Sequence, residues 1–228
     1  MNISKKLLAG SIIASTAVVA PLQASAQATL EEIIVTASKR ESSLQDTSIA
    51  VSAFTADAME QLDINGPADL EALVPSLTWQ QTPNRISIRG VGRFDNSLGI
   101  SPGVAMYNDG VYNAEDAVLY NNAINVQRIE VLRGPQDTLY GRNTTGGAIN
   151  VLSKRPTPEF EGDVRAKFGT DDYVRLDALI SGPITDTLRY KLYYTDTEYD
   201  GWQENINGGP NGRANDSVYA VGQLEWDI

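Results

Sequence analysis

From about residue 160 onward, apolar and polar side chains alternate in four successive segments of about ten residues each. Residues two apart share one face of a β-strand, so each segment predicts a strand with an apolar and a polar face. The segment YVRLDALISGP is the clearest, because alternate positions are all apolar: Val174, Leu176, Ala178 and Ile180. A helix repeats every 3.6 residues and does not fit this pattern.

Strands of this length and alternation are typical of transmembrane β-barrels, although an antiparallel sheet with one wet face gives the same pattern. The second connection, Pro183 to Thr187, is short, whereas the third, from about Asp200 to Asp216, is long and polar. Outer-membrane barrels have short periplasmic turns and longer outer loops, so we expect the first strand to run outward. No stretch of the chain after residue 26 is apolar enough for a membrane helix.

The first 26 residues have the features of a cleaved signal peptide. Lys5 and Lys6 precede the mostly apolar run Leu7–Ala20, and the motif A-S-A ends at Ala26. The apolar run is shorter than the roughly 20 residues that span a bilayer. We therefore expect cleavage between Ala26 and Gln27 and export through the inner membrane.

Composition argues against several functions. The chain carries 18 basic and 29 acidic side chains, which argues against a nucleic-acid partner. It has no His and no Cys, so the usual zinc ligands and imidazole bases are missing. The string GISPG resembles a nucleophile elbow, but Pro102 has no N–H for an oxyanion hole. We predict no enzyme activity, no cofactor and no metal site, and expect any metal to arrive held by its own chelator.

The middle of the chain predicts a compact α+β domain. Thr55 is the expected N-cap of a helix that reaches Leu62, and a second helix begins at Pro67. Asn108-Asp109-Gly110 predicts a hairpin turn. Ahead of this domain, EEIIVTASKR contains four β-branched residues in a row, which favour a strand.

Several strings resemble TonB-dependent outer-membrane receptors. QRIEVLRGPQDTLYGRNTTGGAINVLSKRP resembles the end of their plug domain, DLEALVPSLT and ISIRGVG resemble its earlier part, and EEIIVTASKR resembles the TonB box. Asp137 departs from the small residue expected there. The resemblance divides the chain into a signal peptide (1–26), a flexible tail with the TonB box (27–44), a plug domain (45–156) and about four barrel strands (157–228).

The resemblance implies an α+β plug domain followed by antiparallel β-strands of an incomplete transmembrane β-barrel. The full barrel of about 22 strands would lie in the lipid of the cell outer membrane. TonB, driven through ExbB and ExbD, would capture the box in the periplasm and pull on it to admit a scarce ligand. Ferric siderophores are the commonest ligands of such receptors, and other small-molecule ligands occur.

The resemblance also suggests site residues. The predicted TonB-binding residues are Glu32, Ile33, Ile34, Val35, Thr36 and Ala37. Arg89 and Arg133 match plug arginines that pair with barrel glutamates in relatives, although ordinary sheet-edge charges would look the same. Ligand contacts are expected in the outward loops Arg93–Leu98 and Asn113–Tyr120.

Two other interpretations stay open. An open sheet of four strands leaves backbone groups unpaired in a bilayer, so we expect the chain to be part of a longer receptor. The first alternative is a truncated, transport-incompetent plug-like fragment that only binds TonB or ligand. A secreted carbohydrate-binding or adhesive β-protein is the third interpretation. That last class gives the strand at residues 31–37 no purpose.

Overall fold

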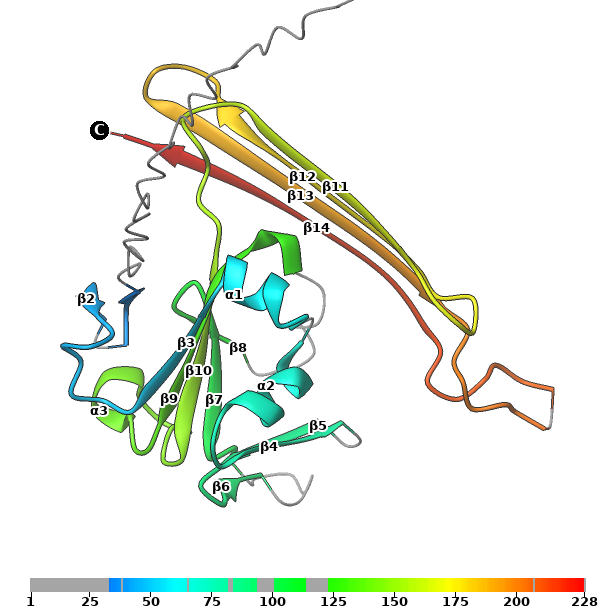
Figure 1. Cartoon of the computed structure of the whole chain (residues 1–228), viewed down its shortest axis with the longest axis horizontal. Coiled ribbons are helices and arrows are strands. Elements are labelled where there is room, and N and C mark those ends of the chain that lie inside the picture. Colours follow the sequence, from blue (N-terminus) through cyan, green and yellow to red (C-terminus); the bar gives the residue numbers. More distant parts are fainter. Residues whose placement is uncertain are drawn as a thin grey trace, which may run out of the picture. The chain divides into compact units, whose positions relative to one another are not determined.

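The structure is a computed structural model, and it describes residues 33–37, 39–64, 66–81, 84–93, 101–113, 123–206 and 208–227. The predicted signal peptide with its cleavage site at Ala26 and Gln27, the predicted box residue Glu32 and most of the two predicted ligand loops lie outside these ranges. Within them, an α+β domain is followed by a separate antiparallel sheet (Figure 1).

The α+β domain is organised around a five-stranded mixed sheet. Its strands, in spatial order, are β3 (Val51–Thr55), β9 (Val126–Arg133), β10 (Gly147–Ser153), β7 (Val104–Asn108) and β8 (Val111–Asn113). β10 and β7 run parallel, and the other neighbours are antiparallel. The predicted hairpin turn therefore joins β7 to β8. The smaller sheets are β4 (Leu77–Gln81) with β5 (Asn84–Ile88) and β6 (Val91–Gly92), and β1 (Ile34–Val35) with β2 (Ser42–Ser43).

The helices begin where their capping residues stand. In α1 (Ala56–Gln61) the Thr55 Oγ1 accepts a hydrogen bond from Ala58 N at 3.3 Å, as the sequence predicted. In α2 (Pro67–Leu73) the Asp69 carboxylate accepts from Gly66 N at 2.9 Å. Both bonds satisfy N–H groups that a first helical turn leaves unpaired. The other helices in the described ranges are α3 (Asp137–Tyr140) and the 3₁₀ turn η2 (Ala123–Asn125).

Apolar side chains cover both faces of the mixed sheet. On one face, Val104 and Met106 of β7 join Ile149 of β10 in a core that also contains residues of α1, α2, β4 and β5. Ala105 and Tyr107 point to the other face and belong to a second, smaller core. The first four residues of β7 are consequently all buried, as expected for a strand covered on both sides.

Four long strands form the second sheet, in chain order: β11 (Glu161–Phe168), β12 (Val174–Pro183), β13 (Leu188–Tyr199) and β14 (Asn215–Trp226). Directly opposed residues share a face, for example Val164 with Ala178, and Ile180 with Leu192. The β12–β13 turn is short and the β13–β14 connection is long, as predicted. None of the helices in the described ranges is long and apolar enough to cross a membrane.

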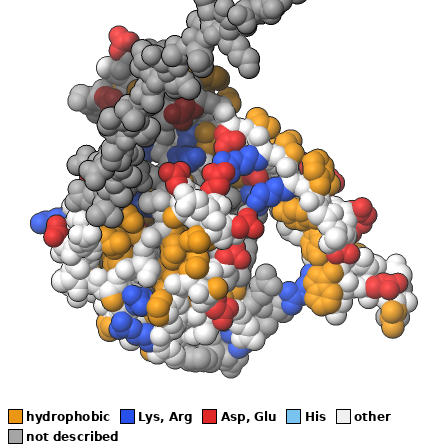
Figure 2. Space-filling view, viewed as in Figure 1, with side chains coloured by type: hydrophobic (Ala, Val, Ile, Leu, Met, Phe, Trp, Pro, Cys, Tyr) orange, Lys and Arg blue, Asp and Glu red, His pale blue; other side chains and the backbone are white. Residues whose placement is uncertain are grey.

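The polarity of this sheet is reversed relative to a soluble protein. Its apolar face is exposed, with Leu192 at 50 % and Leu224 at 69 %, and hydrophobic side chains lie along it in Figure 2. The opposite face is polar and buried: Arg175, Asp177, Ser181, Lys191, Thr195 and Thr197. Ile124 of η2 packs against Leu179 and Tyr193 on that buried face. A sheet with its apolar side outward is the arrangement that a lipid environment favours.

Candidate functional site

The residues that resemble a TonB box form a short strand that packs against the five-stranded mixed sheet. Ile34 and Val35 of β1 lie opposite Ser43 and Ser42 of β2, and Leu44 N donates a 2.9 Å hydrogen bond to the carbonyl oxygen of Ile33. We call residues 33–37 the box segment. The sequence predicted a free tail here; instead, β2 provides this strand with a partner inside the same chain.

The box segment covers the second face of the mixed sheet. Val35 and Ala37 have no exposed surface. Their buried neighbours come from β7, β9, α3 and β10: Ala105, Tyr107, Leu132, Tyr140 and Ala148. The small side chains of Ala105 and Ala148 leave room for the backbone of another segment to approach. Fully burying a valine side chain stabilises a protein by about 1.5–3 kcal/mol, so this contact holds the box segment on the sheet.

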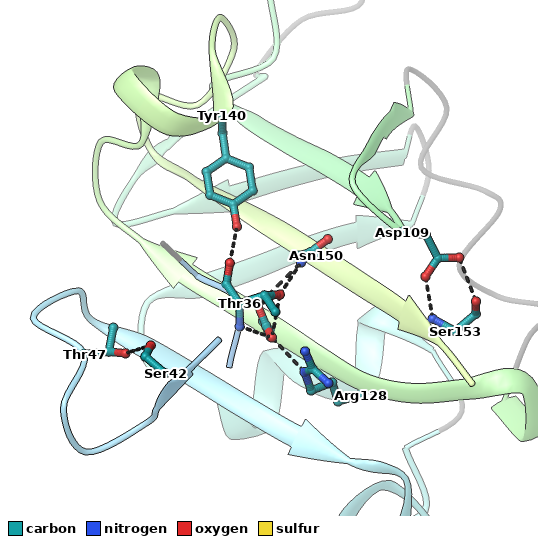
Figure 3. Close-up of polar contacts among 9 residues, drawn as sticks. Thr36, Ser42, Thr47, Asp109, Arg128, Tyr140, Asn150 and Ser153 are labelled. Atoms are coloured by element: carbon teal, nitrogen blue, oxygen red, sulfur yellow. Dashed lines mark hydrogen bonds and ion pairs between the residues drawn. The ribbon is translucent and has the colours of Figure 1, made fainter. Parts of the chain in front are cut away.

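Glu130 of β9 forms the polar centre of the contact. Figure 3 labels its three partners, Thr36, Arg128 and Asn150. The Glu130 side chain is fully buried, and its Oε1 accepts hydrogen bonds from Thr36 N at 2.7 Å and from Arg128 Nε at 2.8 Å. The Thr36 hydroxyl donates at 3.1–3.2 Å, and Asn150 Nδ2 lies 3.4 Å from Oε2. A buried carboxylate is tolerated only with such partners, and Arg128 compensates its charge.

Two tyrosines and a lysine enclose the other end of the segment. The Lys39 ammonium lies 4.3 Å from the ring centre of Tyr140 and 5.2 Å from that of Tyr107, within the range of cation–π attraction. The Tyr107 hydroxyl donates to the Tyr140 carbonyl oxygen, and the Tyr140 hydroxyl lies 3.4 Å from the Thr36 carbonyl oxygen. The carboxylate of Glu130 and these rings therefore hold the segment on both sides of Ala37.

The environment of Tyr140 predicts a pH dependence. Burial, followed by the charges of Glu130 and Tyr107, raises the pKa of Tyr140 from 10.0 to about 12. The folded chain keeps this proton up to about pH 12, whereas the unfolded chain loses it near pH 10. The stability from this group is therefore complete below pH 10 and is lost as the pH rises toward 12.

We expect the free energy of unfolding to fall between pH 10 and 12 by on the order of 2 kcal/mol. Denaturant titrations across this range should show a smaller fall in Tyr140→Phe. Tyr112→Phe is the matched control, because Tyr112 is far more exposed. An equal fall in Tyr140→Phe and the unchanged chain would assign the effect to another group.

The two predicted plug arginines are far apart in the sequence, but Arg89 lies near the residue that follows Arg133 in the fold. Arg89 is exposed and has a positive φ of 54°, and its Nη1 lies 3.3 Å from where a Cβ would stand on Gly134. Arg133 precedes that glycine, and its Nε is buried without a hydrogen-bond partner among the described residues. Their pairing with barrel glutamates stays a prediction.

Sequence reasoning missed Glu130, Lys39 and Tyr140 as site residues. The alternation in VQRIEVLRG places Glu130 on the polar side of β9, which suggests a solvated charge. A signal was present nonetheless, because Leu132 shares that face and is apolar. An acidic residue next to apolar ones on one sheet face indicates a covering segment that supplies donors.

A mixed sheet covered by its own N-terminal segment, followed by strands with an outward apolar face, defines a plug-like domain joined to membrane-type strands. Residues 43–148 match the family described as TonB-dependent Receptor Plug Domain. The chain therefore contains the plug domain of TonB-dependent outer-membrane receptors.

Three relatives illustrate the similarity. The chain is 30 % identical to the pesticin receptor of Yersinia pestis over 75 % of its length, and 30 % identical to the probable TonB-dependent siderophore receptor PirA of Acinetobacter baumannii over 86 %. These alignments cover only 26 % and 29 % of the two relatives. The solved structure of the ferric yersiniabactin uptake receptor FyuA from Yersinia pestis superposes with a TM-score of 0.63 and 26 % identity, over 77 % of this chain and 28 % of that one. The relatives are named as receptors and not as enzymes.

Proposed function

We propose that this chain supplies the TonB-docking segment, the plug and the first barrel strands of an outer-membrane receptor for a ferric siderophore. The observation that carries the proposal is the plug match, joined in one chain to a strand-forming N-terminal segment and to a sheet with its apolar face outward. The ligand class follows from the relatives, since PirA is named for a siderophore and FyuA for ferric yersiniabactin.

In this mechanism the segment binds TonB as an added strand. An extended peptide joins an exposed sheet edge through main-chain hydrogen bonds, and β-branched residues suit that conformation. TonB, working with ExbB and ExbD, would then transmit work from the proton gradient to the plug. After signal-peptide cleavage at Ala26, the box residues Glu32 to Ala37 would lie in the periplasm, and the apolar face of β11–β14 would contact lipid.

A disulfide crosslink tests the docking step. None of these 228 residues is Cys, so within this part of the receptor Ile34→Cys introduces a single thiol, on a side chain that is 40 % exposed. In cells carrying the complete receptor, it should crosslink to cysteines placed along the TonB C-terminal domain. Ile184→Cys, an exposed isoleucine in the short β12–β13 turn, is the control and should give no crosslink.

Val35→Pro should reduce energised uptake of the ferric ligand at least about tenfold, because proline removes a backbone donor from a strand that must pair. Uptake of radiolabelled iron measures the effect. In the isolated chain with Trp202→Phe and Trp226→Phe, the fluorescence of buried Trp79 reports whether the plug is still folded. Undiminished uptake in Val35→Pro, or no crosslink through Ile34→Cys, would contradict the proposal.

A further inference from the structure

The outward apolar face of β12–β14 contains an open groove of about 420 Å³. The groove forms where small residues stand beside large ones on neighbouring strands. Ala178 and Ala220 lie opposite Tyr194, and Gly222, which has no side chain, lies opposite Leu192. The volume is within the range of about 300–1,000 Å³ that small-molecule sites occupy. Because such an outward apolar face favours lipid, an acyl chain is the ligand that fits these walls.

Three carboxylates lie beyond one end of the groove, on the side of the long β13–β14 connection. The hydroxyl of Tyr194, which lines the groove, donates to Asp196 Oδ2 at 3.2 Å. Glu198 follows two residues further along the same face, and Asp216 lies directly opposite it on β14. Like charges directly opposite each other on two strands destabilise a sheet. A positive group beside these carboxylates would therefore be favourable.

The four strands supply no positive group on this face. Every Lys and Arg within β11–β14 stands at a position of the opposite, inward face: Arg165, Lys167, Arg175, Arg189 and Lys191. In the β13–β14 connection, Arg213 lies over the ring of Trp202. None of the three carboxylates forms an ion pair with another described residue. The apolar groove thus ends at negative charge that the sheet leaves uncompensated.

We propose that this groove is a specific lipid-binding site: it holds one acyl chain of a lipid whose headgroup carries an amine, and the amine faces Asp196, Glu198 and Asp216. Burial of methylene groups retains the chain, and the carboxylates select the headgroup. The bound amine also offsets the repulsion between Glu198 and Asp216 across β13 and β14. The inference rests on the proposed contact of this face with lipid; TonB and the ferric ligand have no part in it.

Photocrosslinking from within a bilayer tests the site. The complete receptor is placed in phosphatidylglycerol nanodiscs that contain a trace of photoreactive lipid, either phosphatidylethanolamine or phosphatidylglycerol with the same acyl chains. Mass spectrometry of peptides gives the enrichment, which is the crosslinking yield at the groove divided by the mean yield over other lipid-facing peptides. We expect an enrichment of about fivefold or more for phosphatidylethanolamine and of about one for phosphatidylglycerol. Equal enrichment of the two lipids, or of neither, would overturn the proposal.

Ala220→Leu tests the groove itself, because it fills the depression with an apolar side chain that a lipid environment tolerates. The enrichment of phosphatidylethanolamine should fall to about one. Ala166→Leu is the matched control, since Ala166 is also an exposed alanine on the outward face but belongs to β11 and lies outside the groove. Its enrichment should stay within about twofold of the unchanged receptor. A folded Ala220→Leu receptor that keeps the full enrichment would contradict the proposal.

The double variant Asp196→Asn with Glu198→Gln tests headgroup selection, and it decides the question if Ala220→Leu does not fold. Both changes keep the size of the side chain and remove its charge. The enrichment of phosphatidylethanolamine should fall to within about twofold of that of phosphatidylglycerol. Asp172→Asn, in the β11–β12 turn at the same end of the sheet, removes an exposed carboxylate away from the groove and should change nothing. Selectivity that survives the double variant counts against the proposal.

Adding EDTA separates an amine from a metal bridge. A divalent cation between the carboxylates and a lipid phosphate would enrich phosphatidylglycerol, and EDTA would abolish that enrichment; this outcome overturns the proposed headgroup. Phosphatidylethanolamine that stays enriched in EDTA supports it. Crosslinks spread evenly over β11–β14 would contradict only the specific site, whereas their absence from all four strands would also contradict the proposed lipid contact of this face.

Discussion

Replacing Gly147 with alanine should unfold the plug domain. A Cβ at this position would lie 2.2 Å from the carbonyl oxygen of Leu132 and 2.9 Å from Cδ1 of Ile88. The backbone cannot easily move away, because Gly147 begins β10 and pairs with Arg133 on one side and Val104 on the other. Overpacking against a fixed backbone destabilises by several kcal/mol, so we expect a loss of about 3–5 kcal/mol.

Gly110→Ala is the control for the loss of glycine itself. Gly110, like Gly147, has a positive φ (81° and 155°), but no atom of the described residues lies within 4 Å of its would-be Cβ. Its replacement should therefore cost only about 1–2 kcal/mol. Urea titrations with Trp79 as the only tryptophan, after Trp202→Phe and Trp226→Phe, report the plug alone. Equal losses in the two variants would show that the clash is relieved.

Asp177→Ala should have the second large effect, on the four-stranded sheet. Asp177 accepts two hydrogen bonds from Arg175 and one from the hydroxyl of Tyr193, each at 2.8 Å, on the buried polar face. Removing the carboxylate takes away the ion pair and two hydrogen bonds of a buried guanidinium. Breaking such a pair typically costs about 3–5 kcal/mol, and we expect a loss in that range.

Asp163→Ala is the matched control on the neighbouring strand. Asp163 pairs with Arg165 at 3.0 Å, but about a third of each side chain is exposed. Solvent screening limits such pairs to roughly 0–1 kcal/mol. Denaturant titrations in detergent, with Trp226 of β14 as the only tryptophan, measure both variants. A loss at Asp163 as large as that at Asp177 would mean that burial does not set the value of the Arg175 pair.

Local features of the fold were readable from the sequence. Thr55 caps α1, the Asn108-Asp109-Gly110 turn joins β7 to β8, and alternation placed the strands after residue 160 correctly. These features depend on residues a few positions apart, whose geometry is fixed by capping, turn and pleat rules. The resemblance extended them to the plug and its following strands.

The packing of the box segment against the mixed sheet could not be predicted from the sequence in the same way. Thr36 meets Glu130 across 94 residues and Asn150 across 114, so no local periodicity records these contacts. The parallel pairing of β7 with β10 creates the face that the segment covers, and it too is long-range. Sequence reasoning therefore found the strand-forming residues but predicted them to be free.

The hairpin of β1 and β2 also has a direction of mechanical weakness. Ile33 and Leu44 stand together at its open end, joined by a hydrogen bond, and the chain continues from Leu44 toward β3. A load applied ahead of Ile33 opposes the anchor at β3 and therefore acts at that end. The hydrogen bonds between β1 and β2 then break one after another and do not share the load as they would in shear. A small force therefore opens this pair, whereas the ladder between β9 and β10 lies beyond it and stays intact.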